Sequence, residues 1–382
     1  VVRMQQYKKY IITLIGTTGL ALSLFWPTAA QAQISCSGPK CALIPITQDE
    51  YNRMYYEFKD QYSSDLFEDM AQAGVIANLM NAPVGTVNLT GWTVGGNLGA
   101  GYKSAEEVDI DIVGVGKVED VTRAGVAINP RFFLGMNLGA LFGQGFDPLE
   151  EDPDGLTPTP GWFSLSKFDL YVSGIKHTER INNEKGIDGV LRATVKSQGF
   201  EVRYHLVEAS EIFGGPVLRF RGVSLGVGYL QSSQKITYTR PENSVDFTLD
   251  EGVTVQWIGN DLIQLKNDFT TVPVELRTGI QLLYLFNFTV GVGYAWSTGN
   301  SSLLLARFGP VVVNGDLASA LNAVNSGDSF LGMTLAEDGS APARIYYGRA
   351  GVELNLAMIK LGVEGLFTPD DYGASVALRV EF

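Results

Sequence analysis

The chain ends in Tyr372–Phe382, YGASVALRVEF, a stretch that alternates in character at every residue from Ser375 onward. Successive side chains of an extended strand point to opposite faces. The apolar side chains of this stretch would share one face: Val376, Leu378, Val380 and Phe382. The opposite face would carry Arg379 and Glu381 beside small residues. The sequence therefore predicts a terminal β-strand with one apolar and one polar face.

The amino-terminal end has the pattern of a secretory signal. Arg3, Lys8 and Lys9 precede an uncharged apolar stretch over residues 10–26, and Ala30-Gln31-Ala32 provides a small-x-small cleavage site. We expect residues 1–32 to be removed and the mature chain to start at Gln33. An uncleaved membrane anchor is the alternative, since the apolar stretch is close to the shortest spanning length.

A secretory signal combined with a terminal strand that ends in an aromatic residue resembles bacterial outer-membrane β-barrel proteins of the porin and transporter-like class. The resemblance points to no single family. It implies a location in the outer membrane of a Gram-negative bacterium, contact with outer-membrane lipid, and an assembly machinery that recognises the last strand with Phe382 as its signal.

One alternating motif recurs along the chain after Gly91. It appears in GWTVGGNLGAGY (91–102), RFFLGMNLGALF (131–142), GVSLGVGYLQ (222–231), FNFTVGVGYAW (286–296) and MIKLGVEGLF (358–367). Bulky residues alternate with glycine, alanine or polar residues, as in strands with one lipid face. The apolar phase changes across Ser197, Gln198 and Gly199, which requires a turn or a bulge there.

The predicted fold class is all-β: a closed antiparallel transmembrane barrel over residues 86–382. Taking the phase change as a turn gives about twelve strands, and fourteen is the alternative if residues 244–265 supply two spanning strands instead of a hairpin. Closure is required because an unpaired backbone group costs several kcal/mol in hydrocarbon. The uncharged run 278–296 alternates with period two, so it predicts two strands and a tight turn, with a transmembrane helix as the alternative.

Residues 33–85 form a separate amino-terminal segment. Cys36 and Cys41 lie close together in an exported chain, which favours a small oxidised loop. Apolar residues recur at helical spacing from Thr47 to Asn81, and Thr47 with Glu50 indicates a capping box. A second cap-like pair, Asp65 and Glu68, suggests two helices. We leave open whether they plug the barrel or lie in the periplasm.

The inward faces of the predicted strands carry charges of both signs. The candidate pore-lining residues are Glu201, Arg203, Glu275, Arg277, Gln281, Arg349, Glu353, Asn355, Lys360, Glu364 and Arg379. Opposite charges can pair across a lumen, so these residues form either structural ion pairs or a polar path for solutes. Aromatic residues placed at the two membrane interfaces would be Trp92, Trp162, Tyr229, Trp257, Tyr284, Trp296, Tyr346, Tyr347 and Tyr372.

Signals for other chemistry are weak. The two histidines, His177 and His205, lack the spacing to serine that barrel lipid hydrolases have, so we expect no enzyme. DPLEEDPDG (147–155) imitates part of a calcium loop without its last acidic ligand, and we expect no metal and no cofactor. Residues 313–341 form a long connection that could constrict the pore or cover it.

Two functional hypotheses follow. The first is a passive channel or transporter for small solutes, with a fatty-acid-type transporter of hydrophobic compounds as a subsidiary option. The second is a surface-exposed structural or adhesin-like interaction barrel without an open pore. The net charge of −13 excludes a basic footprint for nucleic acid. The sequence leaves the oligomeric state open.

Overall fold

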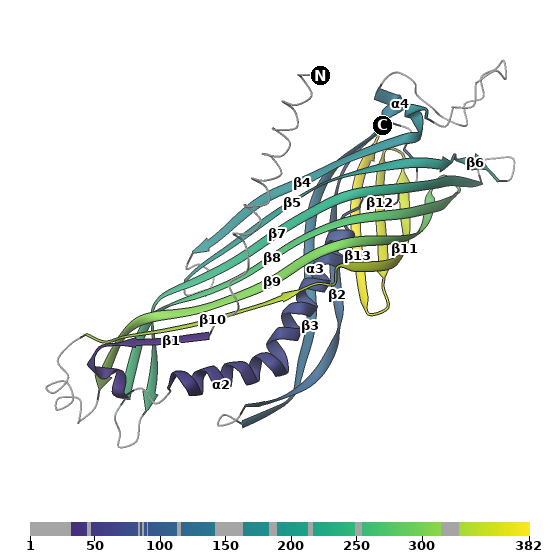
Figure 1. The fold of residues 1–382 in the computed structure, drawn as a ribbon. Coiled ribbons are helices and arrows are strands. Elements are labelled where there is room, and N and C mark those ends of the chain that lie inside the picture. Colours follow the sequence, from purple (N-terminus) through teal and green to yellow (C-terminus); the bar gives the residue numbers. More distant parts are fainter. Residues whose placement is uncertain are drawn as a thin grey trace, which may run out of the picture.

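The computed structural model describes residues 32–43, 47–82, 85, 88–89, 91–112, 116–141, 163–182, 189–212, 217–248, 254–314 and 328–382. These residues form thirteen antiparallel strands, ten of which close into a ring (Figure 1). The ring strands are β2 (Trp92–Ile112), β3 (Gly116–Asn137), β4 (Phe168–Asn182), β5 (Val190–Val207), β7 (Leu218–Thr248), β8 (Thr254–Leu282), β9 (Phe286–Asn314), β11 (Arg344–Leu356), β12 (Ile359–Phe367) and β13 (Asp371–Glu381). The all-β closed barrel predicted from the sequence is confirmed.

The ring closes where the last strand meets the first. β13 pairs with β2, with Val376 opposite Leu98 and Val380 opposite Val94. Beyond β13, the amide of Phe382 donates to the carbonyl of Trp92, and the amide of Trp92 donates back at 2.7 Å. Both sheet edges are therefore satisfied, as hydrocarbon surroundings require.

The ring has ten strands instead of about twelve, because two pairs of segments that alternate separately in the sequence are each one strand: residues 121–129 with the motif at 131–142, and the stretches on either side of Ser197–Gly199. β3 runs without a break through Pro130, and β5 runs through Ser197–Gly199 in unbroken register with both neighbours. The phase change in β5 is neither a turn nor a bulge. It marks a strand whose two halves lie in different environments. Residues 244–265 are the end of the long β7–β8 hairpin, and the two strands predicted in 278–296 are confirmed as β8 and β9.

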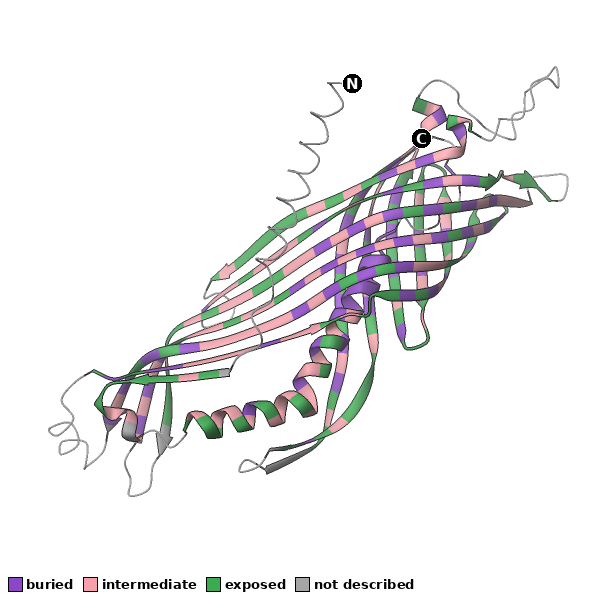
Figure 2. Cartoon of the chain, viewed as in Figure 1, coloured by how far each residue is buried: buried purple, intermediate pink, exposed green. Residues whose placement is uncertain are grey.

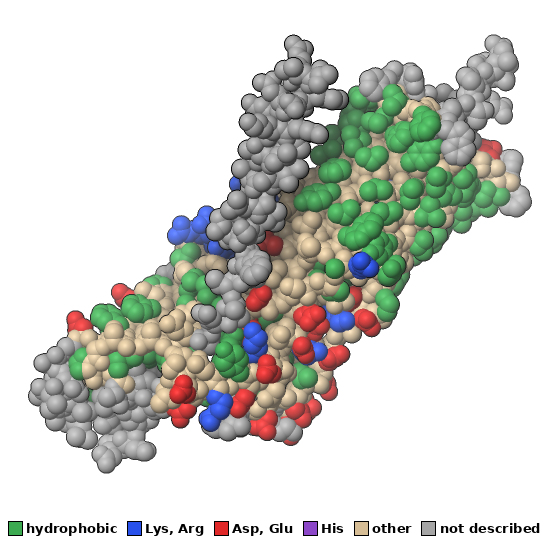
Figure 3. All heavy atoms as spheres, viewed as in Figure 1, with side chains coloured by type: hydrophobic (Ala, Val, Ile, Leu, Met, Phe, Trp, Pro, Cys, Tyr) green, Lys and Arg blue, Asp and Glu red, His purple; other side chains and the backbone are tan. Residues whose placement is uncertain are grey.

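Strands β7, β8 and β9 are 29 to 31 residues long, far more than a bilayer needs. From Phe286 to Trp296, β9 covers roughly 33 Å, which a tilt of about 40° reduces to about 25 Å, the height of a lipid-facing apolar band. Outward aromatic rings cluster at that level: Tyr294 lies 4.7 Å from Trp296 and 4.8 Å from Tyr346, centroid to centroid. Figure 3 shows apolar side chains gathered over the ring and charged ones over the other half.

The part beyond this level, which we call the extension, has two lobes. β3 pairs with β4 only over Phe132–Asn137, so the β2–β3 hairpin separates there from the sheet β4-β5-β7-β8-β9 (Figure 1). β10 (Phe330–Ser340) pairs with residues 300–310 of β9, and β1 (Ala32–Ser37) pairs with β10. The prediction that residues 313–341 form no strand is therefore wrong for Phe330–Ser340. The remaining elements are β6 (Ser210–Glu211), α4 (Leu138–Leu141) and η3 (Leu165–Lys167).

The amino-terminal segment runs from the extension into the ring. It contains η1 (Pro39–Leu43), α2 (Gln48–Phe58), the π turn η2 (Lys59–Ser63) and α3 (Ser64–Leu79). Thr47 and Glu50 form the predicted capping box, but α2 continues through η2 into α3, and Asp65 pairs with Arg123 rather than capping. Only Tyr55 of the eleven residues of α2 is buried, whereas ten of the sixteen residues of α3 are (Figure 2). No helix in the described ranges is both long and apolar enough to cross a membrane.

Three predictions lie outside the described residues. They are the signal peptide up to residue 31, the calcium-like stretch 147–155 and residues 315–327 of the 313–341 connection. Trp162 of the aromatic set also lies there.

Candidate functional site

The lumen of the ring is occupied by α3. The helix contacts β2, β3, β7, β8, β9, β10 and β13, and Val75, Ile76 and Leu79 have no exposed surface. Glycines on the inward faces of the strands allow this approach. A Cβ atom added to Gly101 of β2 would lie 2.0 Å from the carbonyl oxygen of Ala73, and one added to Gly125 of β3 would lie 2.1 Å from that of Asp69. The glycines of the first copy of the strand motif, Gly99 and Gly101, therefore make room for the helix, as Gly125 does on β3.

Asn78, near the end of α3, is bonded to three strands. Its side-chain amide donates to the carbonyl of Leu230 at 3.1 Å and to the hydroxyl of Thr271 at 3.0 Å. Its side-chain oxygen accepts from Asn129 at 3.2 Å and from Arg131 at 3.3 Å. Each hydrogen-bonding position of this fully buried amide is used, so the contact fixes both the depth and the rotation of the helix.

A charged network lies beside the end of α3. Arg277 Nε donates to Glu275 Oε1 at 2.6 Å, and Arg349 lies 3.4 Å from the other oxygen of Glu275. Glu364 lies between the two arginines, at 3.2 Å from Arg349 and 3.4 Å from Arg277. Arg349 also donates to the carbonyl of Leu79 at 3.0 Å, and Tyr347 donates to Glu275 at 3.0 Å. The network therefore joins β8, β11 and β12 to the last residue of the helix.

A second network lies nearer the rim that carries the chain end. Arg379 of β13 contacts Glu353 of β11 at 2.8 Å, and Asn287 of β9 donates to the same carboxylate at 2.8 Å. Lys360 pairs with Glu381, which lies 3.6 Å from Arg379. Buried ions need this mutual compensation, because an isolated charge would lose several kcal/mol of hydration.

The structure places all eleven candidate pore-lining residues on or near the inward face. Nine are buried: Glu201, Arg203, Glu275, Arg277, Gln281, Arg349, Glu353, Glu364 and Arg379. Asn355 and Lys360 are partly exposed near the rim, where Asn355 donates to the carbonyl of Tyr284. Arg203 pairs with Glu201 and lies 5.2 Å above the ring of Tyr171. The charged members of the set are brought together as ion pairs, and Gln281, like Asn355, donates to the carbonyl of Tyr284.

Sequence reasoning missed the residues that hold the helix. Asn78 and Arg131 were not candidates, although a single asparagine within the apolar run 73–80 of a helix is a signal for a buried polar contact. Two residues assigned to the aromatic interfaces are elsewhere. Tyr347 is buried in the lumen, and Trp257 is buried in the extension. Both have the inward phase of their strands.

The two histidines have different surroundings. His177 is exposed and lies 3.4 Å from Glu179. His205 is buried, with its Nε2 2.7 Å from Asp169, which also accepts from the amide of Leu89 and from Asn137. Asp169 thus fixes part of the segment that follows α3. No group of three or more His, Cys, Asp or Glu side chains among the described residues could hold a metal ion.

Comparison with known proteins identifies the family. The family model described as Lsa36-like matches residues 29–382, nearly the whole chain. The chain belongs to the Lsa36-like family. No curated protein matches it.

Solved structures similar to this member of the family are outer-membrane β-barrel proteins, the class that the sequence resembles. The outer membrane protease OmpT from Escherichia coli is 10% identical, with 78% of this chain and 98% of that chain covered and a TM-score of 0.34. The toluene transporter TodX from Pseudomonas putida is 8% identical, with 80% and 92% covered and a TM-score of 0.21. The transport unit of the Escherichia coli autotransporter AIDA-I is 10% identical, with 80% and 95% covered and a TM-score of 0.26. These are similarities of fold.

Proposed function

We propose that this protein is an outer-membrane barrel without an open pore, which holds its extension outside the cell as a structural or interaction surface. The observation that carries the proposal is α3, which packs against six strands of the ring and against β10, with side chains such as Val75, Ile76 and Leu79 that have no exposed surface. The ion pairs beside it are further support, because they use the polar side chains that a solute path would need.

The orientation follows from the two ends of the ring. Tight turns join β8 to β9 at Leu283–Leu285 and β11 to β12 at Ala357–Met358, and Phe382 lies at the same rim. Outer-membrane barrels have short turns on the periplasmic side and longer segments outside. The extension lies at the opposite end, and so it would face the exterior.

A passive channel is the competing function, and it requires α3 to leave its seat. Moving the helix would leave Arg131, Asn129 and Thr271 without Asn78 and would leave Arg349 without the carbonyl of Leu79. Arg131 would keep Ser197 and Arg349 would keep Glu364, but each buried polar group left without a partner costs about 1–3 kcal/mol. The open state would therefore be rare at rest.

Single-channel recording in planar bilayers tests the proposal. We expect the mature chain to give no stepwise currents, and a variant lacking residues 33–85 to give steps because the lumen is emptied. Steady channels from the intact mature chain would overturn the proposal. If the deletion variant fails to fold, Asn78→Leu is the milder variant, and we expect brief openings from it that the wild type lacks. Strand-rich circular dichroism confirms folding in each case.

A further inference from the structure

The extension contains a cavity of about 640 Å³, a size typical of small-molecule sites. One wall is the inward face of the sheet β7–β10, where Trp257, Ile263 and Met333 line it. The other wall is the amino-terminal segment, which contributes Ile34 from β1 and Tyr51 and Met54 from α2. The cavity lies in the extension, outside the ring, so it is separate from the charged networks beside α3.

The cavity leaves large apolar side chains accessible in a part of the molecule that lies outside the apolar belt. Ile263 is 42% exposed, and the adjacent cluster of Val255, Trp257, Val311, Val313 and Leu331 is buried. Apolar surface of this kind in water is unfavourable unless a partner covers it, at roughly 25 cal/mol per Å². The lining therefore favours a hydrocarbon ligand.

The polar groups at this wall are already paired with the protein. Arg307 donates to Asp261 at 2.6 Å and to the carbonyl of Trp257 at 2.9 Å, and its guanidinium lies 4.8 Å from the indole centroid. It also donates to the carbonyl of Asn243, where β7 has a register shift. Arg307 and Asp261 thus neutralise each other. Arg240, the third charged side chain of the lining, also has a partner within the protein, so a ligand would not need a charged group of its own.

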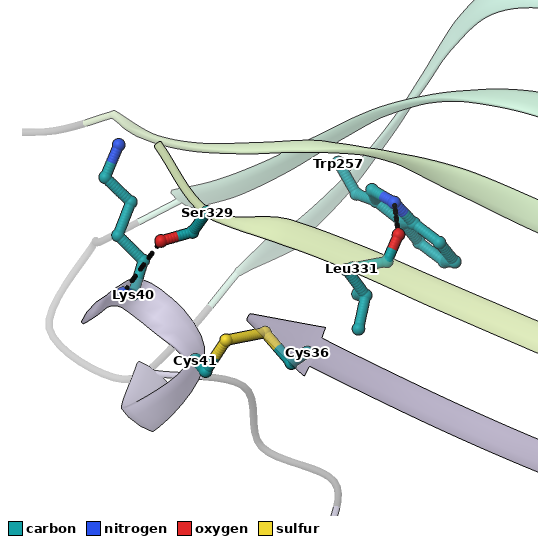
Figure 4. The surroundings of a disulfide bond; sticks show 6 residues. All are labelled: Cys36, Lys40, Cys41, Trp257, Ser329 and Leu331. Atoms are coloured by element: carbon teal, nitrogen blue, oxygen red, sulfur yellow. Dashed lines mark hydrogen bonds between the residues drawn. A yellow bond between two sulfur atoms is a disulfide. The ribbon is translucent and has the colours of Figure 1, made fainter. Parts of the chain in front are cut away.

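The amino-terminal wall is fixed in place before any ligand arrives. Cys36 and Cys41 form a disulfide that joins β1 to η1, beside the start of β10, with which β1 pairs (Figure 4). The amide of Lys40 donates to the hydroxyl of Ser329 at 3.0 Å, and Trp257 donates to the carbonyl of Leu331 at 3.1 Å. The amide of Ile34 donates to Gln48 at the start of α2, at 3.0 Å. A pre-formed wall lowers the ordering cost of binding.

We propose that this cavity binds one free, uncharged and largely hydrocarbon molecule, which packs against Trp257 and Ile263 on the sheet and against Met54 on α2. The proposal goes beyond the closed barrel. It does not depend on whether α3 leaves the lumen, so conductance and ligand binding can fail independently.

Bromine quenching of Trp257 tests the proposal. The mature protein in nanodiscs is titrated with 1-bromonaphthalene and, separately, with 1-bromooctane, and the fluorescence of a Trp257→Phe variant is subtracted. We expect saturable quenching, because a bound bromine atom contacts the indole. Brominated phospholipid in the nanodisc is the third arm, and we expect no quenching of Trp257 from it. Quenching by the lipid alone would overturn the proposal of a free ligand.

Two matched variants locate the site. Ile263→Glu puts a carboxylate into the cavity and should weaken the apparent affinity about tenfold or more, since burying an unpaired charge is costly. Ile236→Glu is the control, because Ile236 lies in the same sheet, is similarly exposed at 44%, and does not line the cavity. Met54→Glu repeats the test from α2 without altering a strand. No saturable quenching, or equal quenching in all variants, would overturn the proposal.

Discussion

One strand, β8, carries two opposite kinds of inward side chain. Within the ring its inward positions hold Glu275 and Arg277, and within the extension the same odd-numbered phase holds Val255 and Trp257. The pairing of β8 with β9 has no register shift between these positions. The polarity of the face changes, while its direction stays the same.

The difference in polarity between the two inward faces shows which medium surrounds the ring and which surrounds the extension. In the ring the outward side chains are apolar, as Val290 and Val292 are, so lipid takes the apolar face and the polar side chains turn inward. In the extension water takes the outer face, and apolar side chains turn inward to form a core and a cavity. The inversion thus marks the membrane boundary at the level of Trp296 and Tyr346.

The largest effect that this comparison predicts comes from breaking one ion pair on each side of the boundary. Glu275→Ala leaves Arg277 and Arg349 buried with one carboxylate fewer, and we expect a loss of about 3–5 kcal/mol in the free energy of unfolding. Asp268→Ala on the same strand breaks an exposed pair with Lys266 and should cost under about 1 kcal/mol. Urea titration in lipid vesicles measures both. Equal costs would contradict the boundary.

A charge on the outward face sharpens the comparison. Val290→Arg places a cation on a side chain position that is 55% exposed in the apolar belt, and we expect a cost of about 2–4 kcal/mol. Phe308→Lys changes a position on the extension half of β9 that is 60% exposed. It should cost about 1 kcal/mol, the value of its stacking contact with Phe330. If the second variant cost as much as the first, the belt would have to reach Phe308.

The sequence predicted the barrel because the alternation of apolar and polar side chains can be recognised within a single strand. It did not predict the number of ring strands, since β5 changes the polarity of its inward face between Val195 and Glu201 without any break in pairing. A strand that passes from lipid into water and a strand that ends in a turn both shift the phase of the apolar residues by one position. Only the partner strand distinguishes them.

The candidate site was predicted in part for a related reason. Inward charges such as Arg349 and Glu364 follow from strand phase alone, so they could be named. The helix that uses them could not be placed, because Asn78 contacts Leu230, Thr271 and Asn129 from three strands that are distant in sequence. Contacts of that kind depend on closure of the ring, which periodicity does not describe.

The seat of α3 offers a test of how tightly the lumen is filled. Gly101→Val would bring a side chain against the backbone of Ala73, and overpacking of this kind costs about 1–3 kcal/mol. We expect α3 to become sensitive to chymotrypsin, which can cleave after Leu66 and Phe67, while the ring stays folded. Gly348→Val on β11 is the control, since nothing lies within 4 Å of the added Cβ atom. Equal protease resistance in both variants would mean that α3 does not need this contact.

The smallest expected effect lies at the start of α2, in the extension. The backbone amide of Thr47 donates to Glu50 at 2.9 Å, and this bond, with that of the Thr47 hydroxyl, lowers the pKa of the Glu50 carboxyl. A group whose pKa is lowered by folding stabilises the fold above its ordinary pKa, and that contribution is lost as the pH falls. The first turn of α2 should therefore loosen below about pH 4.

A spin label at the exposed position Arg53 measures this loosening through its mobility. The wild type should show a rise in mobility as the carboxyl takes up its proton. Glu50→Gln keeps a hydrogen-bonding side chain at this position but does not titrate, so its profile should be flat. Identical profiles would show that the capping box does not hold this end of the helix. In that case Ile34, Gln48 and the disulfide would fix the cavity wall without it.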